Sequence, residues 1–413
     1  MARMKWTGLI AAALCAVGPA QGQLLPQLPR VGGVVDRVTD VLPDVSHTLG
    51  DAQALVRAQA QRARDLVRRH PDRIVLDRDG NAVRAGELIM VDADDAVAQA
   101  AAARGFRLIE RVELDGLGVG YARFATPRGI TLSRAIKQLE ALAGGREVSA
   151  DPLYFPSGTI GPVAPAGPAV QRRGGKAGRI GIIDGGVPVG TPGLSRQLGF
   201  AQGSPRASDH ASGIASLLTG GGGVRASAPG AQLVVADVYG SDPAGGNAAA
   251  IGQALAWMAR ERVPVVVVSL TGPSNPLLAR IVTAARRLGT VVVAAVGNDG
   301  PAARPAYPAS YREAIAVTGV DARGRVLIEA GRATKLDYAA PGADLLAVGT
   351  DGRARQVRGT SFAVPFVAAR LSAHLGEGGV DAALVALDRE AQGRGRRGLG
   401  RGLVCADCAT RSR

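Results

Sequence analysis

The sequence predicts an α/β protein in which a doubly wound parallel-sheet domain follows a smaller α+β domain. From Arg179 onward, short and nearly continuous apolar segments alternate with helical ones, which is typical of parallel strands covered on both faces. Between Glu87 and Phe155, the order strand, helix, strand, strand, helix, strand predicts a split βαβ unit. A length of 413 residues fits two or three domains.

The composition supports a large core built from small aliphatic side chains. Hydrophobic residues make up 46% of the chain but aromatic residues only 3%. The net charge of +14 would suit nucleic acid or a membrane surface. No basic run is interleaved with aromatic residues, as single-strand binding would require. We therefore interpret the charge as basic residues scattered over solvated faces, and we predict no nucleic-acid partner.

The first 22 residues have the features of an export signal. A basic start, Met1–Lys5, precedes a short apolar stretch, Trp6–Val17, and small residues end at Gly22. The apolar stretch is too short for a comfortable membrane span, so a retained anchor is the weaker alternative. We expect cleavage before Gln23 and export to the periplasm or the medium.

The part before the main domain divides into three predicted segments. Residues 23–86 are irregular apart from a helix at 51–69. Residues 87–156 form the small domain, with strands at 87–91, 107–112 and 119–124, helices at 94–104 and 133–142, and a last extended piece. Residues 157–177 are rich in Gly and Pro and predict an exposed, flexible linker.

The main domain is predicted to span residues 178–392. Its apolar strands are expected at 179–184, 233–238, 265–270 and 290–296, and its helices at 246–260, 276–288 and 361–374. In a doubly wound sheet the active residues gather at the carboxyl ends of the strands, where Asp184 and Asn298 fall. Residues 393–413 form a basic tail whose Cys405 and Cys408 favour a local disulfide over a zinc site.

A run of small residues, Gly359-Thr360-Ser361, stands before an apolar helical segment that contains Pro365. A serine at such a helix start has unpaired backbone N–H groups around it, which can stabilise negative charge that develops on oxygen. Pro365 fits because proline is tolerated in the first turn of a helix. Ser361 is therefore a candidate nucleophile.

Three upstream segments supply what a serine nucleophile needs. Asp184 ends an apolar strand at a Gly-Gly turn, His210 opens a small-residue helix, and Asn298 follows an apolar strand in Gly-Asn-Asp-Gly. Serine needs a base to take its proton, and that base needs an orienting group. Asp184, His210 and Ser361 can fill these roles. Asn298 can donate a hydrogen bond to the oxyanion.

The order Asp, His, Asn, Ser, each in a glycine-marked segment, resembles the subtilisin-like serine proteases, or subtilases, over residues 178–390. The resemblance implies an endopeptidase that forms an acyl-enzyme. It also implies substrate-binding residues at Ser269, Leu270, Gly272 and Gly297. Two positions depart from the family pattern: Gly185 replaces a hydroxyl residue, and Ala211-Ser212 replaces Gly-Thr.

The resemblance also bears on partners and maturation. The small domain resembles a subtilase propeptide, which implies an intramolecular inhibitor. The position and predicted flexibility of residues 157–176 suggest a zymogen that cleaves itself in this segment. We expect a monomer that acts on polypeptides. Many subtilases bind calcium, but no acidic loop marks a site here, so calcium is left open and no other cofactor is expected. The competing functions are a weak or inactive subtilase-like binding protein, and a nucleotide-binding α/β protein.

Overall fold

The computed structural model describes residues 42–165, 178–376 and 378–410. It divides into two compact units, Met1–Thr48 and Leu49–Arg413. The predicted signal at 1–22 and most of the predicted linker, 166–177, lie outside the described residues. Of the described helices, none combines the length and the apolar character needed to cross a membrane.

A seven-stranded parallel sheet forms the centre of the main domain, within the described residues. Its strand order is β15-β14-β13-β11-β8-β10-β9, so the chain builds outward in one direction and then in the other, as a doubly wound sheet does. The predicted fold class is confirmed. The strands are β8 (Arg179–Asp184), β9 (Leu194–Gly199), β10 (Gln232–Asp237), β11 (Val265–Val268), β13 (Val291–Ala295), β14 (Ile315–Val320) and β15 (Tyr338–Pro341).

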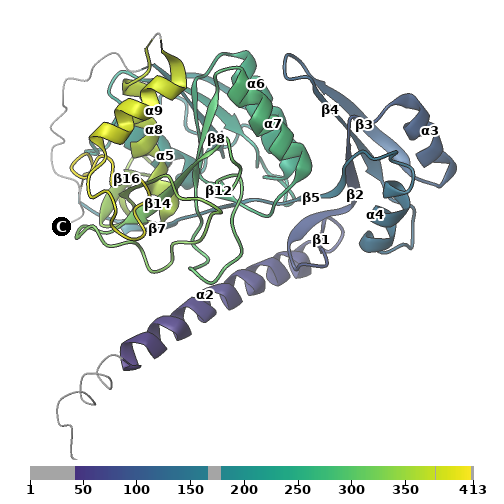
Figure 1. Cartoon of the computed structure of the whole chain (residues 1–413), viewed down its shortest axis with the longest axis horizontal. Helices are drawn as coiled ribbons and strands as arrows, with labels where there is room; N and C mark the ends of the chain where they lie inside the picture. The colour runs from purple at the N-terminus through teal and green to yellow at the C-terminus, as the bar shows by residue number, and fades with distance from the viewer. Residues whose placement is uncertain (1–41, 166–177, 377, 411–413) are drawn as a thin grey trace, which may run out of the picture. The chain divides into compact units, whose positions relative to one another are not determined.

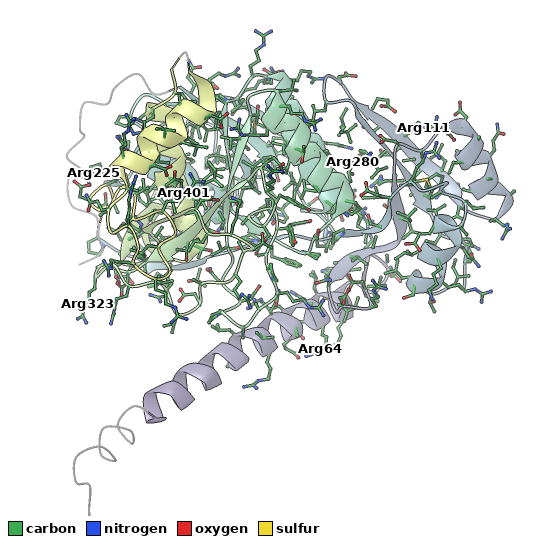
Figure 2. The ribbon with its side chains drawn as sticks, viewed as in Figure 1. Arg64, Arg111, Arg225, Arg280, Arg323 and Arg401 are labelled. Carbon is green, nitrogen blue, oxygen red and sulfur yellow. A yellow bond between two sulfur atoms is a disulfide. The ribbon has the colours of Figure 1, made fainter. Side chains whose placement is uncertain are left out.

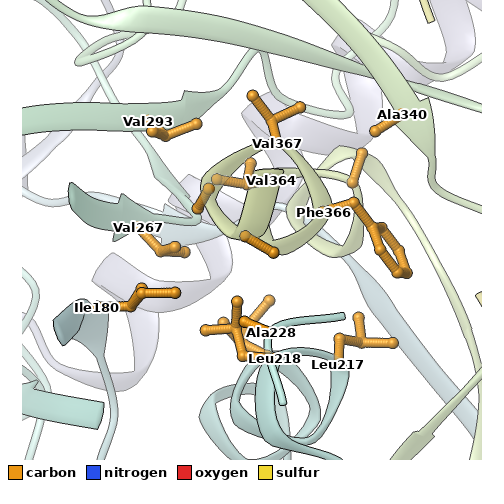
Figure 3. Packing of buried hydrophobic residues seen from close by; sticks show 14 of the residues in the cluster. Ile180, Leu217, Leu218, Ala228, Val267, Val293, Ala340, Val364, Phe366 and Val367 are labelled. Atoms are coloured by element: carbon orange, nitrogen blue, oxygen red, sulfur yellow. The ribbon is translucent and has the colours of Figure 1, made fainter. Parts of the chain in front are cut away.

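Alternate side chains of this sheet serve two cores. Ile180 and Val267 point to one face, where they pack with α5 (Asp209–Thr219) and α8 (Val364–Ala373), as Figure 3 shows. Ile183 and Val266 point to the other face, against α6 (Ala248–Arg260) and α7 (Pro276–Arg287). Figure 1 shows α6 and α7 side by side. Helix α9 (Gly379–Glu390) packs on α8.

Side-chain caps fix where three of these helices begin. Ser208, Asn247 and Asn275 each accept a hydrogen bond from the backbone N–H three residues later, at the starts of α5, α6 and α7. Asp209 is the first residue of α5, and its carboxylate instead accepts from the backbone N–H and the hydroxyl of Thr350. The N-cap of α5, the helix that contains His210, is therefore Ser208 and not Asp209.

The small domain is a split βαβ unit as predicted. Strands β2 (Ala82–Val91), β3 (Arg107–Leu114), β4 (Val119–Ala125) and β5 (Val148–Pro152) form an antiparallel sheet with β1 (Ile74–Leu76). Helices α3 (Asp95–Ala103) and α4 (Leu132–Glu140) cover one face. Strand β2 crosses the predicted boundary at residue 87, because β1 and β2 pair as a hairpin. The preceding helix, α2, spans Leu42–Arg69.

The other face of the small domain packs on the main domain. Ile89, Val91 and Tyr121 belong to the same buried cluster as α6 and α7. The Asn275 amide, which caps α7, also donates to Ser149 Oγ (3.0 Å) and to the Ala150 carbonyl (3.3 Å). The small domain and the main domain therefore share one buried cluster and have polar contacts at the start of α7.

Part of the predicted linker is ordered as strand, contrary to the sequence prediction. Within it, Thr159–Val163 (β7) pairs with Ala354–Arg358 (β17), which also pairs with Leu345–Val348 (β16). Just before it, Phe155–Pro156 (β6) pairs with Leu270–Thr271 (β12). Glycine and proline suggested a linker. However, β7 is an edge strand, where a proline without an N–H is tolerated.

The predicted basic tail is also part of the fold. Leu399 and Val404 are buried, and Leu403 forms bridges to Ala339 and Gln392. Cys405 and Cys408 form the expected disulfide. The main domain therefore continues to about residue 410, because this segment buries apolar side chains. The many arginines of the segment had suggested an exposed tail.

The arginines lie on many different elements, as the labelled examples in Figure 2 show. Several are paired with carboxylates: Arg111 with Asp95, and Arg280 with Asp92. This distribution agrees with the interpretation of the positive charge as a property of solvated faces.

Candidate active site

Asp184 and His210 meet at the carboxyl edge of the central sheet. Asp184 ends β8 and is 1% exposed, and its Oδ2 lies 2.8 Å from His210 Nδ1. Its Oδ1 accepts from the Gly185 N–H at 2.7 Å. When the carboxylate is ionised it only accepts hydrogen bonds, so Nδ1 donates, and in a neutral ring the lone pair is then on Nε2.

The turn after Asp184 explains the departure from the family pattern at Gly185. A Cβ at Gly185 would lie 2.5 Å from Ser208 Oγ, and one at Gly186 would lie 2.8 Å from the Arg206 carbonyl oxygen. Ser208 is the cap that starts the His210 helix. Glycines at 185 and 186 therefore allow the Asp184 strand and the His210 helix to approach closely.

Ser361 lies in a 3-10 turn, Thr360–Phe362, immediately before α8. The sequence predicted one helix from Ser361, whereas the chain makes this turn first. Ser361 is fully buried, and its hydroxyl donates to the Ser269 carbonyl at 2.9 Å. His210 Nε2 is buried and has no hydrogen-bond partner among the described residues. The structure thus joins Asp184 to His210, but it shows no bond between His210 and Ser361.

The carbonyl oxygen of Ser157 occupies the centre of this site. It accepts from the Asn298 amide (2.5 Å) and from the Ser361 backbone N–H (3.0 Å). The Asn298 Oδ1 is held in turn by the N–H (3.0 Å) and the hydroxyl (3.1 Å) of Thr360. Two donors that converge on one carbonyl oxygen form the geometry of an oxyanion hole.

Gly359 makes this approach sterically feasible. Its φ is +138°, and a Cβ there would lie 2.4 Å from Asn298 Nδ2 and 2.6 Å from the Ser157 carbonyl oxygen. A larger residue would both strain the backbone and fill the space where the carbonyl meets its donors. In the Gly-Thr-Ser run, Gly359 therefore allows the close approach, the Thr360 hydroxyl orients Asn298, and Ser361 is the candidate nucleophile.

Three of the four predicted substrate-binding residues contact residues 154–157. Ser269 accepts from the Ser157 N–H at 3.2 Å, and Leu270 pairs with Pro156 in a short antiparallel ladder. Gly272 lies under the Tyr154 ring, and a Cβ there would be 2.6 Å from it. Gly297 has a φ of +91° and faces Thr271 and Ala306.

Two residues of this cleft were missed by sequence reasoning. Thr271 Oγ1 is 2.7 Å from Ser157 Oγ, and both side chains are buried. The fully buried Tyr154 donates its hydroxyl to the Pro273 carbonyl at 2.7 Å, and its N–H bonds to the Gly246 carbonyl at 2.8 Å. The run Tyr154-Phe155-Pro156-Ser157 was a usable signal, because two aromatic residues stand out in a chain with few.

No group of three or more His, Cys, Asp or Glu side chains that could hold a metal ion occurs among the described residues. We therefore assign no residues to calcium.

Comparison with known sequences establishes the relationship. Residues 175–376 match the model of the subtilase family. Subtilisin BL of Lederbergia lenta is 32% identical over 212 residues, which cover 49% of this chain and 78% of that protein. This chain is a subtilase.

Other comparisons agree with the fold and the class. This subtilase is 29% identical over 218 residues to the major intracellular serine protease of Bacillus subtilis, covering 48% of this chain and 68% of that one. The crystal structure of fervidolysin from Fervidobacterium pennivorans, a keratinolytic enzyme related to subtilisin, aligns with a TM-score of 0.64 at 18% identity. That alignment covers 82% of this chain and 63% of fervidolysin, and it supports the fold.

Proposed function

We propose that this subtilase is an exported serine endopeptidase, made as a zymogen that cleaves itself between Ser157 and Gly158. One observation carries the proposal: the Ser157 carbonyl oxygen lies between Asn298 Nδ2 and the Ser361 N–H, where an attacked carbonyl must lie. The basic and apolar start of the sequence supports export.

The mechanism assigns one role to each residue. The Ser361 hydroxyl leaves the Ser269 carbonyl and gives its proton to His210 Nε2 as Oγ bonds to the Ser157 carbonyl carbon. Asp184 orients the ring and stabilises the imidazolium. Asn298 and the Ser361 N–H hold the oxyanion. The Ser157–Gly158 bond breaks as His210 protonates the Gly158 nitrogen, and water then releases the Ser157 carboxylate.

The residues before Ser157 are suited to act as an intramolecular inhibitor after cleavage. Residues 154–157 fill the cleft through backbone bonds on both sides. Arg84 and Arg73 pair with the Asp242 carboxylate, in the turn before Gly246, at 2.9 and 3.0 Å. Arg62 of α2 pairs with Asp299, next to the oxyanion residue, at 2.7 Å. These contacts support retention of the cleaved segment.

Asp151 makes this retention dependent on pH. Burial raises the pKa of its carboxyl to about 7, while the Ala249 N–H, Arg84 and Arg123 oppose the shift and Glu87 adds to it. A raised pKa in the folded state gives stability that is complete below the unfolded pKa near 4 and is lost as pH rises to 7. We therefore expect the small domain to be held more weakly at neutral pH.

The test is chemical denaturation of the uncleaved Ser361→Ala chain from pH 4 to 8, with and without Asp151→Asn. As pH rises from 4 to 7, the chain that keeps Asp151 should lose free energy of unfolding relative to the Asp151→Asn variant, by up to about 1.4 kcal/mol per pH unit. The difference should level off above pH 7. A stability difference that does not change with pH would contradict the assignment.

A weak or inactive binding protein is the second candidate. It is favoured by the Ser361 hydroxyl, which donates to Ser269 and not to His210. The two candidates differ in nucleophile reactivity, because only an activated serine reacts readily with a fluorophosphonate.

The deciding experiment uses the chain without its signal segment. The protease predicts a fluorophosphonate label on Ser361, a new N-terminus at Gly158 and hydrolysis of a polypeptide such as casein. A folded chain that stays full length and does not label would establish the binding-protein alternative.

A further inference from the structure

The seated segment shows which side chain the site accepts before the scissile bond. Ser157 is 3% exposed, and its Oγ lies 2.7 Å from Thr271 Oγ1. Thr271 is itself 9% exposed, and its methyl group would be 3.5 Å from a Cβ at Gly297. A side chain that extended beyond Oγ in this direction would overlap Thr271.

The hydroxyl pair also adds a polar requirement. Among the described residues, Thr271 Oγ1 has no hydrogen-bond partner other than Ser157 Oγ. A buried hydroxyl that loses its partner keeps the cost of desolvation. A substrate with alanine at this position therefore fits in size but leaves Thr271 without a bond.

Tyr154, three residues before Ser157, is also held by specific contacts. The Tyr154 ring lies on Gly272, its hydroxyl reaches the Pro273 carbonyl, and Tyr239 donates to its backbone carbonyl at 2.8 Å. Tyr154 thus anchors the segment and sets which residue reaches Thr271.

We propose that Thr271 is a specificity-determining residue, which makes the enzyme prefer serine before the scissile bond and reject large side chains there. The inference rests on the proposed function. The expected substrates are polypeptides with an exposed segment in which an aromatic residue lies three positions before a serine, and cleavage follows that serine.

Peptide substrates of the form Tyr-Phe-Pro-X, with a chromogenic anilide after X, test the idea on the self-processed enzyme. For the wild type, kcat/KM should be about fivefold to tenfold higher for Ser than for Ala. It should be at least about 100-fold lower for Phe. Thr271→Val, which removes the hydroxyl but keeps the size, should bring the Ser to Ala ratio close to one. Thr271→Gly should raise the relative rate for Phe.

Thr290→Val is the matched control. Its hydroxyl is buried and bonds the Val263 carbonyl at 2.8 Å, at the amino end of β13 and so at the opposite edge of the sheet. This variant should keep the wild-type preference. A wild type that cleaves the Phe peptide as fast as the Ser peptide would overturn the inference, as would a Thr271→Val enzyme that keeps the Ser preference.

Self-cleavage of the full chain gives a second test that does not depend on a purified mature variant. Ser157→Phe should slow cleavage at Gly158 by about 100-fold or more, and Thr271→Gly in the same chain should restore it. Failure of this rescue would count against the role of Thr271. Absence of fluorophosphonate labelling in the wild type would instead defeat the proposed protease function, so the two failures are distinguishable.

Discussion

The Ser361→Ala chain should remain uncleaved, while the wild-type chain yields a product that begins at Gly158. The substitution removes only the hydroxyl and leaves the Ser361 backbone N–H, so the Ser157 carbonyl should stay seated between its two donors. Loss of a triad nucleophile costs about 10⁶ in turnover. That magnitude was established on subtilisin, a member of this family, and is borrowed here.

Mass spectrometry and N-terminal sequencing over hours measure this result. Ser372→Ala is a suitable control, because Ser372 is a buried serine of α8 whose hydroxyl has no hydrogen-bond partner among the described residues. That variant should process like the wild type. Cleavage of the Ser361→Ala chain at the same bond, in the absence of any added protease, would remove Ser361 from the mechanism.

Replacement of Asn298 by alanine should give the second large effect, a loss of about 10² to 10³ in kcat, a range that also comes from a subtilisin. The Asn298 amide is one of two donors to the Ser157 carbonyl, so the Ser361 N–H alone would face the charge that develops on oxygen. The loss should appear in kcat more than in KM, because the bond strengthens as that charge forms.

Thr360→Val separates the two contributions of Asn298. It removes one hydroxyl that holds Asn298 Oδ1 but keeps the amide donor and the Thr360 N–H. We expect a loss of about tenfold or less. Steady-state kinetics on a peptide substrate distinguishes the variants. Equal kcat for Asn298→Ala and the wild type would mean that the Asn298 amide does not stabilise the transition state.

The sequence allowed the sheet and the site residues to be predicted because both leave local signatures. Continuous valines such as Val265–Val268 mark a strand buried on both faces, and Asp184, Asn298 and Ser361 stand next to or near glycines that the close packing requires. The residues of the cleft were harder to predict. Thr271 becomes important only because it lies opposite Ser157, which is more than a hundred positions away.

The segments that sequence analysis placed wrongly have a common physical cause. Thr159–Val163 and the region around Leu399–Val404 contain glycine, proline or arginine, which suggest exposed chain. Both are held by long-range partners, β17 for the first and Ala339 for the second. Composition alone does not reveal pairing of this kind.

The ladder between β7 and β17 bears on the order of events in activation. The chain on one side of Ser157–Gly158 is held by β12, and the chain on the other side is held by β17, so both ends of the bond are part of the same folded molecule. Under the proposed self-cleavage, scission is a unimolecular event whose half-life does not depend on protein concentration. Departure of the cut segment is a dissociation, which dilution favours. The proposal thus separates cleavage from release of the cleaved segment, and a cleaved chain that retains this segment would not act on other proteins.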